Sequence, residues 1–265
     1  MRFRRIGLLF CLLLYSSVWA QQTATTSAQG VVLLQQSLGV LAGATSIADV
    51  TLTGTARRIA GSDDETGAVV LKALATGEAR MDFSFPSGQR SEVRTNSNNV
   101  PAGTWTGPDG KAHSQSQHNL MTDSSWFFPA LTIGRLVSSQ SSSVSLVGQE
   151  TRGGISVVHL IASQQFSVLV APAEIAAELQ HLSQMDIFLD SSTQLPVVVS
   201  FNQHPDNDAG LDIPVEIRFS DFRAVNGVQV PFRIQKYLNN SLILDIQIQT
   251  ATLSSSLTAS AFAIQ

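Results

Sequence analysis

Residues 215–236 read VEIRFSDFRAVNGVQVPFRIQK, and this stretch decides the fold class. Apolar and polar residues alternate on both sides of Asn226-Gly227, which is the strongest two-residue hairpin signal in the chain. In the second arm, Phe232, Ile234 and Lys236 share one face of the expected strand. The pattern therefore predicts two long antiparallel strands with one face turned to a core and one to water.

Strand-like segments of the same kind recur along most of the chain. They are residues 50–57, 67–74, 78–85, 144–149, 155–161, 185–190, 197–201 and 242–253. Consecutive strands joined by short turns form antiparallel sheets, and a sheet of about ten strands either closes or curls strongly. We therefore expect an α+β fold that is mainly β, built on one large curled antiparallel sheet.

Three segments depart from the strand pattern and predict helices. Residues 31–41 have apolar positions three or four apart and are expected to form one helix that ends near Gly43. Residues 126–136 are densely apolar and predict one or two short helices, and residues 172–182 predict another. These helices are expected to cover the apolar face of the sheet. The apolar positions of the first helix are Val31, Leu34, Leu38 and Leu41.

The first twenty residues have the order that is typical of a secretory signal peptide. Residues 1–5 contain three arginines, residues 6–15 are apolar, and Val18-Trp19-Ala20 places small residues at the −3 and −1 positions of a cleavage site. Residues 1–20 are therefore predicted to be a signal peptide that is cleaved near Ala20. The mature protein is expected to be periplasmic or secreted.

The rest of the chain is predicted to form one unit. Residues 21–30 are small and polar and predict a mobile segment, and residues 31–265 predict a single domain. The net charge of −4 lacks the basic footprint of a nucleic-acid-binding protein. The one cysteine, Cys11, lies in the predicted leader, which excludes a disulfide scaffold or a Cys-rich metal site. No later apolar run reaches the length of a transmembrane helix.

Three motifs near the C-terminus carry a resemblance to a known superfamily. Residues 185–196 (MDIFLDSSTQLP) and 219–233 (FSDFRAVNGVQVPFR) resemble two hairpins of exported bacterial proteins of the LolA-like superfamily, which includes outer-membrane lipoprotein-sorting-like and LppX-like proteins. The ending at residues 253–262 is also similar, with Ser254 where Asn is more usual. The resemblance implies an unclosed half-barrel whose concave apolar face is plugged or covered by helices and can hold acyl chains.

The inward apolar residues have two interpretations. Most of them pack in a core, whereas a subset is predicted to line a cavity for a hydrophobic ligand, because a curled sheet offers more apolar face than a few helices cover. The aromatic segment at 126–136 is expected to act as a lid that opens. The candidate ligand-binding residues are Val69, Leu71, Phe83, Phe85, Trp126, Phe127, Phe128, Leu131, Ile187, Leu189, Val199, Phe201, Ile217, Phe219, Phe232 and Ile234.

The sequence contains none of the common catalytic or cofactor-binding motifs, such as a G-x-S-x-G elbow, a phosphate-binding loop or H-E-x-x-H. We therefore predict that the protein is not an enzyme and has no cofactor or catalytic residues. His113 and His118 lie in a Ser/Gln-rich stretch and are interpreted as solvated. Residues 204–210 and the nearby acids suggest a polar hairpin loop rather than a calcium site, so no metal is predicted.

Three functional hypotheses follow. The first is an exported envelope protein that binds or carries an acyl-chain or other lipid-like ligand in a half-barrel cavity. The second is an envelope interaction or sensor module that binds a protein partner on the same sheet, and this module would have a filled core. The third and weakest is a hydrolase, which would require a Ser or Asp beside a His in a cleft.

Overall fold

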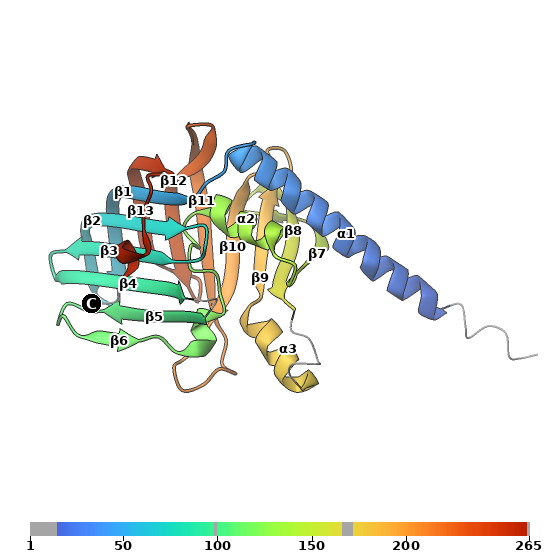
Figure 1. The fold of residues 1–265 in the computed structure, drawn as a ribbon, viewed down its shortest axis with the longest axis horizontal. Helices are drawn as coiled ribbons and strands as arrows, with labels where there is room; N and C mark the ends of the chain where they lie inside the picture. The colour runs from blue at the N-terminus through green and yellow to red at the C-terminus, as the bar shows by residue number, and fades with distance from the viewer. Residues whose placement is uncertain (1–14, 98–99, 166–171, 264–265) are drawn as a thin grey trace, which may run out of the picture.

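The protein is built on one thirteen-stranded antiparallel sheet (Figure 1). The computed structural model describes residues 15–97, 100–165 and 172–263. The strands follow the spatial order β6-β5-β4-β3-β2-β1-β13-β12-β11-β10-β9-β8-β7, and β6 and β7 are not paired with each other. The sheet is therefore curled but unclosed, which confirms the predicted mainly β fold class and the half-barrel.

The strands have the following bounds: β1 Asp49–Ala60, β2 Asp63–Leu74, β3 Ala79–Phe85, β4 Gly88–Ser97, β5 Val100–Thr106, β6 Ala112–Ser114, β7 Ser142–Arg152, β8 Ile155–Gln164, β9 Met185–Asp190, β10 Pro196–Gln203, β11 Ile213–Val225, β12 Val228–Leu238 and β13 Ser241–Leu253. The helices are α1 Tyr15–Ala42, α2 Pro129–Ser138 and α3 Ala173–Leu182, with short 3₁₀ turns η1 Gln117–Leu120 and η2 Ala259–Phe262.

The hairpin at Asn226-Gly227 forms as the sequence predicts. Val225 and Val228 are the last residue pair of β11 and β12, so the loop between these strands has two residues. Asn226 and Gly227 have φ angles of 50° and 83°. Asn and Gly tolerate this left-handed backbone region, which a two-residue turn between right-twisted strands requires. The register of the β11–β12 hairpin is therefore set by local chemistry.

Helix α1 is longer than predicted. It begins at Tyr15 and contains residues 21–30, which the sequence predicted to be a separate polar segment. Leu34 and Leu41 are fully buried as expected, but Val31 is 39% exposed. At Gly30 the helix backbone lies so close to the sheet that an added Cβ atom would be 2.9 Å from the Ser145 backbone. The absence of a side chain lets the helix lie directly on β7.

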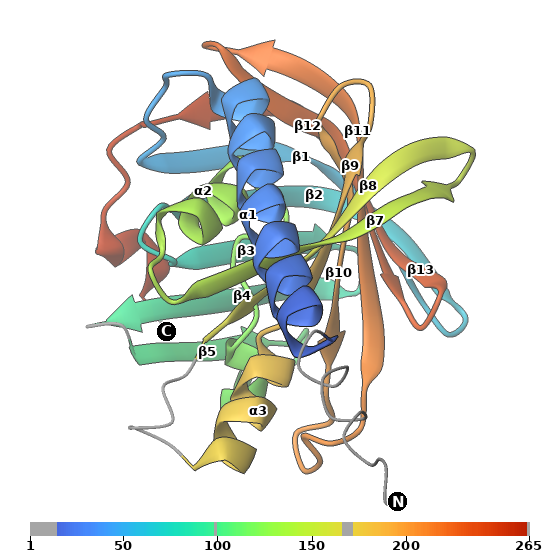
Figure 2. The same ribbon diagram turned by 90° about the vertical axis from the view of Figure 1, so that its right-hand side faces the viewer.

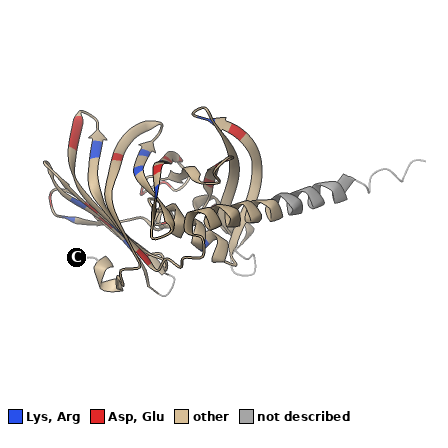
Figure 3. Ribbon diagram, turned by 90° about the horizontal axis from the view of Figure 1, so that it is seen from above, with Lys and Arg blue, Asp and Glu red and all other residues tan. Residues whose placement is uncertain are grey.

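Helices α1 and α2 cover the concave side of the sheet (Figure 2). Helix α1 contacts β7, β12 and α2. Its described part carries no charged residue (Figure 3). The helices therefore cover the apolar face of the sheet, as predicted. Helix α3 also forms at the predicted position and contacts β8 and η1.

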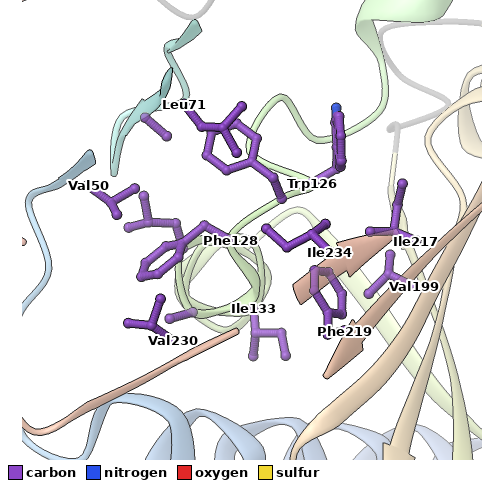
Figure 4. Close-up of a cluster of buried hydrophobic side chains, with 14 of the residues drawn as sticks. Val50, Leu71, Trp126, Phe128, Ile133, Val199, Ile217, Phe219, Val230 and Ile234 are labelled. Carbon is purple, nitrogen blue, oxygen red and sulfur yellow. The ribbon is translucent and has the colours of Figure 1, made fainter. Parts of the chain in front are cut away.

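The core is filled by the aromatic segment that precedes α2. Phe127, Phe128 and Ile133 have no exposed surface. Figure 4 shows Phe128 and Ile133 between residues from opposite arms of the curled sheet, with Val50 on one side and Ile217 on the other. One cluster joins these residues to the inward faces of most strands. This segment holds the two arms of the half-barrel together.

Residues 1–14 lie outside the described residues, so the structure does not test the predicted signal peptide. Within the part of the chain that is described, no helix combines the length and the apolarity needed to cross a bilayer.

Candidate ligand-binding cavity

A cavity of about 770 Å³ opens at one end of the concave face. Its walls come from the β1–β2 and β12–β13 hairpins and from strands β3, β4 and β5. These strands are brought together by the curl of the sheet, in which β1 pairs with both β2 and β13. Pockets of roughly 300–1,000 Å³ are typical of small-molecule binding sites.

The walls are mainly apolar. Met81, Phe83 and Phe85 alternate along β3 and face the cavity, and the Phe83 and Phe85 rings stack with centroids 5.6 Å apart. Leu238 and Leu244 face them from β12 and β13. Burial of apolar surface contributes roughly 25 cal/mol per Å², so such walls favour an apolar ligand.

Three cationic side chains line the cavity, and one of them, Arg58, is paired with Glu65 at 3.1 Å. The other two, Lys236 and Arg90, have no carboxylate within salt-bridge distance among the described residues. Lys236 pairs in register with Ile217 and Leu244, and its Nζ lies 4.9 Å from the centre of the Trp126 ring. No carboxylate of the described residues lies within salt-bridge distance of this ammonium. Burial lowers the pKa of Lys236, although Glu92 acts in the opposite direction. The cost of the buried charge is therefore not compensated by a partner.

Arg90 is the second of these two cations. Its Nε is buried and has no hydrogen-bond partner among the described residues, and Nη2 reaches only the Ser87 hydroxyl at 3.5 Å. The acid that lines the cavity, Glu92, accepts a 2.8 Å hydrogen bond from Gln115 Nε2 and lies 3.4 Å from Arg94 Nε. Glu92 is thus already partnered, and the cavity presents an excess of positive charge.

Three of the sixteen predicted ligand-binding residues line this cavity. They are Phe83, Phe85 and Trp126. The other thirteen lie in the hydrophobic core: Val69, Leu71, Phe127, Phe128, Leu131, Ile187, Leu189, Val199, Phe201, Ile217, Phe219, Phe232 and Ile234. The ten of them that lie on strands face the concave side as expected, but α1, α2 and the aromatic segment fill the space in front of these ten. The other three, Phe127, Phe128 and Leu131, are themselves part of that filling. Ligand contact by these thirteen residues stays a prediction.

The sequence analysis missed the polar part of the cavity. Lys236 follows Phe232 and Ile234 at the same period-2 spacing, so its inward position was visible in the sequence. A lysine on an otherwise apolar strand face is the signal that identifies it. Arg90 gave no such signal, because β4 has few apolar residues and its inward face is not evident from the pattern.

The segment that the sequence predicted as a lid is fastened inside the fold. Arg135 of α2 donates hydrogen bonds from Nε and Nη2 to Asp123, at 3.0 and 2.6 Å from Oδ2, and from Nη1 to the Leu74 carbonyl at 3.2 Å. Burial raises the pKa of Asp123, but the charge of Arg135 and the hydrogen bonds from Arg135 and Ser125 bring it below its usual value. These hydrogen bonds hold the segment inside the half-barrel, as expected of a plug. Its opening as a lid stays a prediction.

The histidines are less uniform than predicted. His113 is exposed and stacks on Trp105, as expected for a solvated residue. The prediction for His118 is wrong, because its ring is half-buried and its Nε2 lies 3.0 Å from the Pro205 carbonyl oxygen. His204 has a side chain that is only 1% exposed. Contacts with His118 of η1 and His181 of α3 bury His204, whereas residues 206–208 and 210–212 of the same connection are exposed.

Comparison with solved structures identifies the class of fold. The structure is similar to a domain named for outer membrane lipoprotein sorting from Vibrio parahaemolyticus, with a TM-score of 0.56, 11% identity, and coverage of 89% of this chain and 97% of that one. A DUF1329 family protein from Desulfovibrio piger is similar with a TM-score of 0.55 and 12% identity, over 90% of this chain and 97% of that one. A LolA superfamily protein from Nitrosomonas europaea is similar with a TM-score of 0.54 and 9% identity, over 89% of this chain and 97% of that one.

These likenesses confirm, at the level of the fold, the resemblance seen in the hairpin motifs: the protein has an unclosed half-barrel similar to those of the lipoprotein-sorting domain and the LolA superfamily protein. No family model and no curated protein matches the sequence. At such low identities the similarity concerns the fold alone, so the function has to be argued from the cavity.

Proposed function

We propose that the protein binds one hydrophobic ligand in this cavity, and that the ligand is an acyl-chain amphiphile with an anionic head group. The observation that carries the proposal is the pairing of an apolar cavity of about 770 Å³ with two cations that lack carboxylate partners in the described part of the chain. An anionic head would satisfy Lys236 and Arg90, and the acyl chain would contact β3 and the β12–β13 hairpin.

The cavity volume favours ligand binding over the alternative of an interaction or sensor module without ligand. That alternative predicts a filled core, with no cavity beyond about 300 Å³. The cavity exceeds this value by more than a factor of two. An envelope protein partner at the rim is compatible with a bound ligand, and Trp105, which is 42% exposed, stands at that rim.

We also propose that the protein is not an enzyme. Among the described residues, Ser116 is the serine whose hydroxyl lies within hydrogen-bonding distance of a histidine, with Oγ 3.0 Å from His118 Nε2. No carboxylate in the same part of the chain contacts His118, so the group that orients the base in a Ser-His-Asp arrangement is lacking. No cofactor is proposed.

The place of action follows from the predicted leader. We propose that residues 1–20 direct export and are removed near Ala20, and that residues 31–265 act as one domain in the periplasm or outside the cell. N-terminal sequencing of the protein recovered from an envelope fraction of an expressing bacterium tests this step. A mature N-terminus that begins at residue 1 would contradict it.

Native mass spectrometry of the same preparation tests the ligand. We expect one co-purifying amphiphile per chain, and saturable displacement of a fluorescent fatty acid by an unlabelled one. Absence of both an adduct and saturable binding would refute the proposal. Equal affinities for a fatty acid and for the fatty alcohol of the same chain length would support binding of the acyl chain in the cavity. The same result would contradict recognition of the anionic head group.

A further inference from the structure

Three side chains from separate parts of the chain meet at the end of the sheet where α3 and the β10–β11 connection lie (Figure 1). His181 is in the last turn of α3, His204 follows β10 and Asp212 precedes β11. Their side-chain ligand atoms all lie within 4.8 Å of one another. His181 Nε2 is 2.9 Å from Asp212 Oδ1, and His204 Nδ1 is 3.5 Å from the same oxygen.

His204 supplies an independent observation. Its side chain is 1% exposed, and neither ring nitrogen has a hydrogen-bond partner among the described residues. The Leu211 backbone lies close to the ring but forms no hydrogen bond of acceptable geometry with it. Buried polar atoms in native proteins are satisfied in the large majority of cases, so an orphaned imidazole that faces a second histidine and a carboxylate requires an explanation.

The donor set defines the kind of ion. Two imidazoles and one carboxylate suit a borderline divalent ion, and Zn²⁺ accepts this combination at about 2.0–2.2 Å from each donor. Donors at that distance in a tetrahedron are separated by roughly 3.3 Å. The two distances to Asp212 Oδ1, 2.9 and 3.5 Å, bracket this value. The donor atoms of the two histidines are at most 4.8 Å apart, so small side-chain movements bring all three donors to this spacing.

We propose that His181, His204 and Asp212 form a binding site for a divalent transition-metal ion, with Zn²⁺ as the best match. His181 and Asp212 are 46% and 41% exposed, so the ion reaches the site from solvent. The fourth position is taken by water. His118 lies nearby, with its ring centre 5.8 Å from that of His204, but its Nε2 is already engaged by Ser116 and Pro205.

Binding at this position would join α3 to the β10–β11 connection. The existing link between these elements at the site is the His181–Asp212 pair, whose two side chains are 46% and 41% exposed and which a change of rotamer would break. A shared ion replaces this exposed pair with coordination bonds to both elements and occupies a lone pair of the buried His204. The proposal does not depend on the ligand of the cavity, which lies at another part of the sheet.

The test compares variants of the whole protein, without a histidine tag, in titrations of ZnCl₂ against a fluorescent zinc indicator. His181→Gln and Asp212→Asn remove one donor each at exposed positions, so both variants are expected to fold. His159→Gln is the matched control, because His159 Nε2 lies 2.6 Å from Asp186 Oδ1 without a third donor beside it. We expect one Zn²⁺ per chain, and at least about a tenfold loss of affinity in either donor variant.

Each outcome has a clear meaning. Wild-type affinity in His159→Gln together with the tenfold loss in His181→Gln and Asp212→Asn supports the site. The proposal is overturned if the wild type binds no Zn²⁺ saturably, if the donor variants bind as the wild type does, or if His159→Gln loses as much as they do. Calcium binding without zinc binding would also overturn it, because an imidazole pair does not select Ca²⁺. His204→Ala, checked for folding by circular dichroism, is expected to lose binding as well.

Discussion

Replacement of Lys236 by methionine distinguishes a role in ligand binding from a role in stability, because the two effects should have opposite signs. The variant should be more stable than the wild type and should bind the ligand more weakly. Methionine has a similar length, so it keeps an apolar side chain beside the Trp126 ring and opposite Leu244 on β13. It removes the ammonium whose pKa is lowered by burial. Lys72→Met is the matched control, since this residue lies on β2 and pairs with Thr51 and Arg80 rather than with the cavity wall.

The two effects have different sizes. Replacement of a buried ion pair by apolar residues of similar volume is neutral or stabilises proteins by about 1–4 kcal/mol. For the single, half-buried charge of Lys236 we expect a gain at the lower end of this range, about 1 kcal/mol. A hydrogen bond to a charged group contributes about 1.5–3 kcal/mol. Its loss should lower the affinity for a fatty acid roughly 10- to 100-fold. The affinity for the fatty alcohol of the same chain length should change little.

The pH dependence of the stability tests independently whether Lys236 destabilises the fold. Because the pKa of Lys236 is lower in the folded protein than the ordinary 10.5, the unfolded chain binds more protons between the two values. The stability cost of the lysine is therefore complete below the lowered pKa and is relieved as the pH rises toward 10.5. The stability advantage of Lys236→Met should shrink over the same range. Fatty-acid affinity of the wild type should fall as the lysine loses its proton, and that of the variant should not.

Fatty-acid titrations and urea denaturation of the three proteins, each at several pH values, measure these quantities. The reasoning is refuted if Lys236→Met binds the fatty acid as tightly as the wild type does. It is also refuted if Lys72→Met loses the same affinity, because the effect would then reflect net charge rather than the cavity.

Three further predictions concern stability and the division between core and cavity. Asp123→Asn should cost about 3 kcal/mol in urea denaturation, because it leaves Arg135 buried without its partner, whereas Asp221→Asn, in an exposed pair with Arg223, should change stability little. Phe128→Ala should cost about 3–5 kcal/mol through a core cavity, whereas Phe83→Ala should mainly weaken ligand binding; equal stability losses would contradict the assignment of Phe83 to the cavity wall. Burial raises the pKa of Asp49, but hydrogen bonds from Ser255, Ser256 and Leu257 bring it below 3.8, so its contribution should be complete above pH 3.8 and lost as the pH falls through the lowered value. Asp49→Ala should cost about 1–3 kcal/mol at pH 7 and should reduce the acid dependence measured between pH 7 and pH 2.

The strands were predictable because their signals are local. Side chains alternate across a strand every two residues, so the inward face of β11 and β12 was readable without knowledge of the fold. Asn226-Gly227 specified the turn between them by the backbone angles that these two residues tolerate. The start of α1 was not predictable in this way, because residues 21–30 have no apolar periodicity and continue a helix that begins earlier.

The candidate sites were predictable only in part. The sequence showed that Phe128 and Phe83 face inward. It did not show that Phe128 is enclosed in the core, whereas Phe83 lies at an open cavity. His181, His204 and Asp212 carried no common pattern, because they come from a helix and from the two ends of a loop. Proximity of this kind arises from the path of the chain rather than from spacing along it.

The sequence by itself determined the large curled antiparallel sheet, since its strands and hairpins follow from steric preferences that act over a few residues. The resemblance of the hairpin motifs to a known superfamily added the expectation that this sheet is an unclosed half-barrel. The tertiary structure alone decided which inward residues form a core, which line a cavity, and which polar groups meet there. These outcomes depend on where distant helices pack against the sheet. Lys236 shows both levels: its inward direction is local, but its lack of a carboxylate partner among the described residues is a property of the assembled fold.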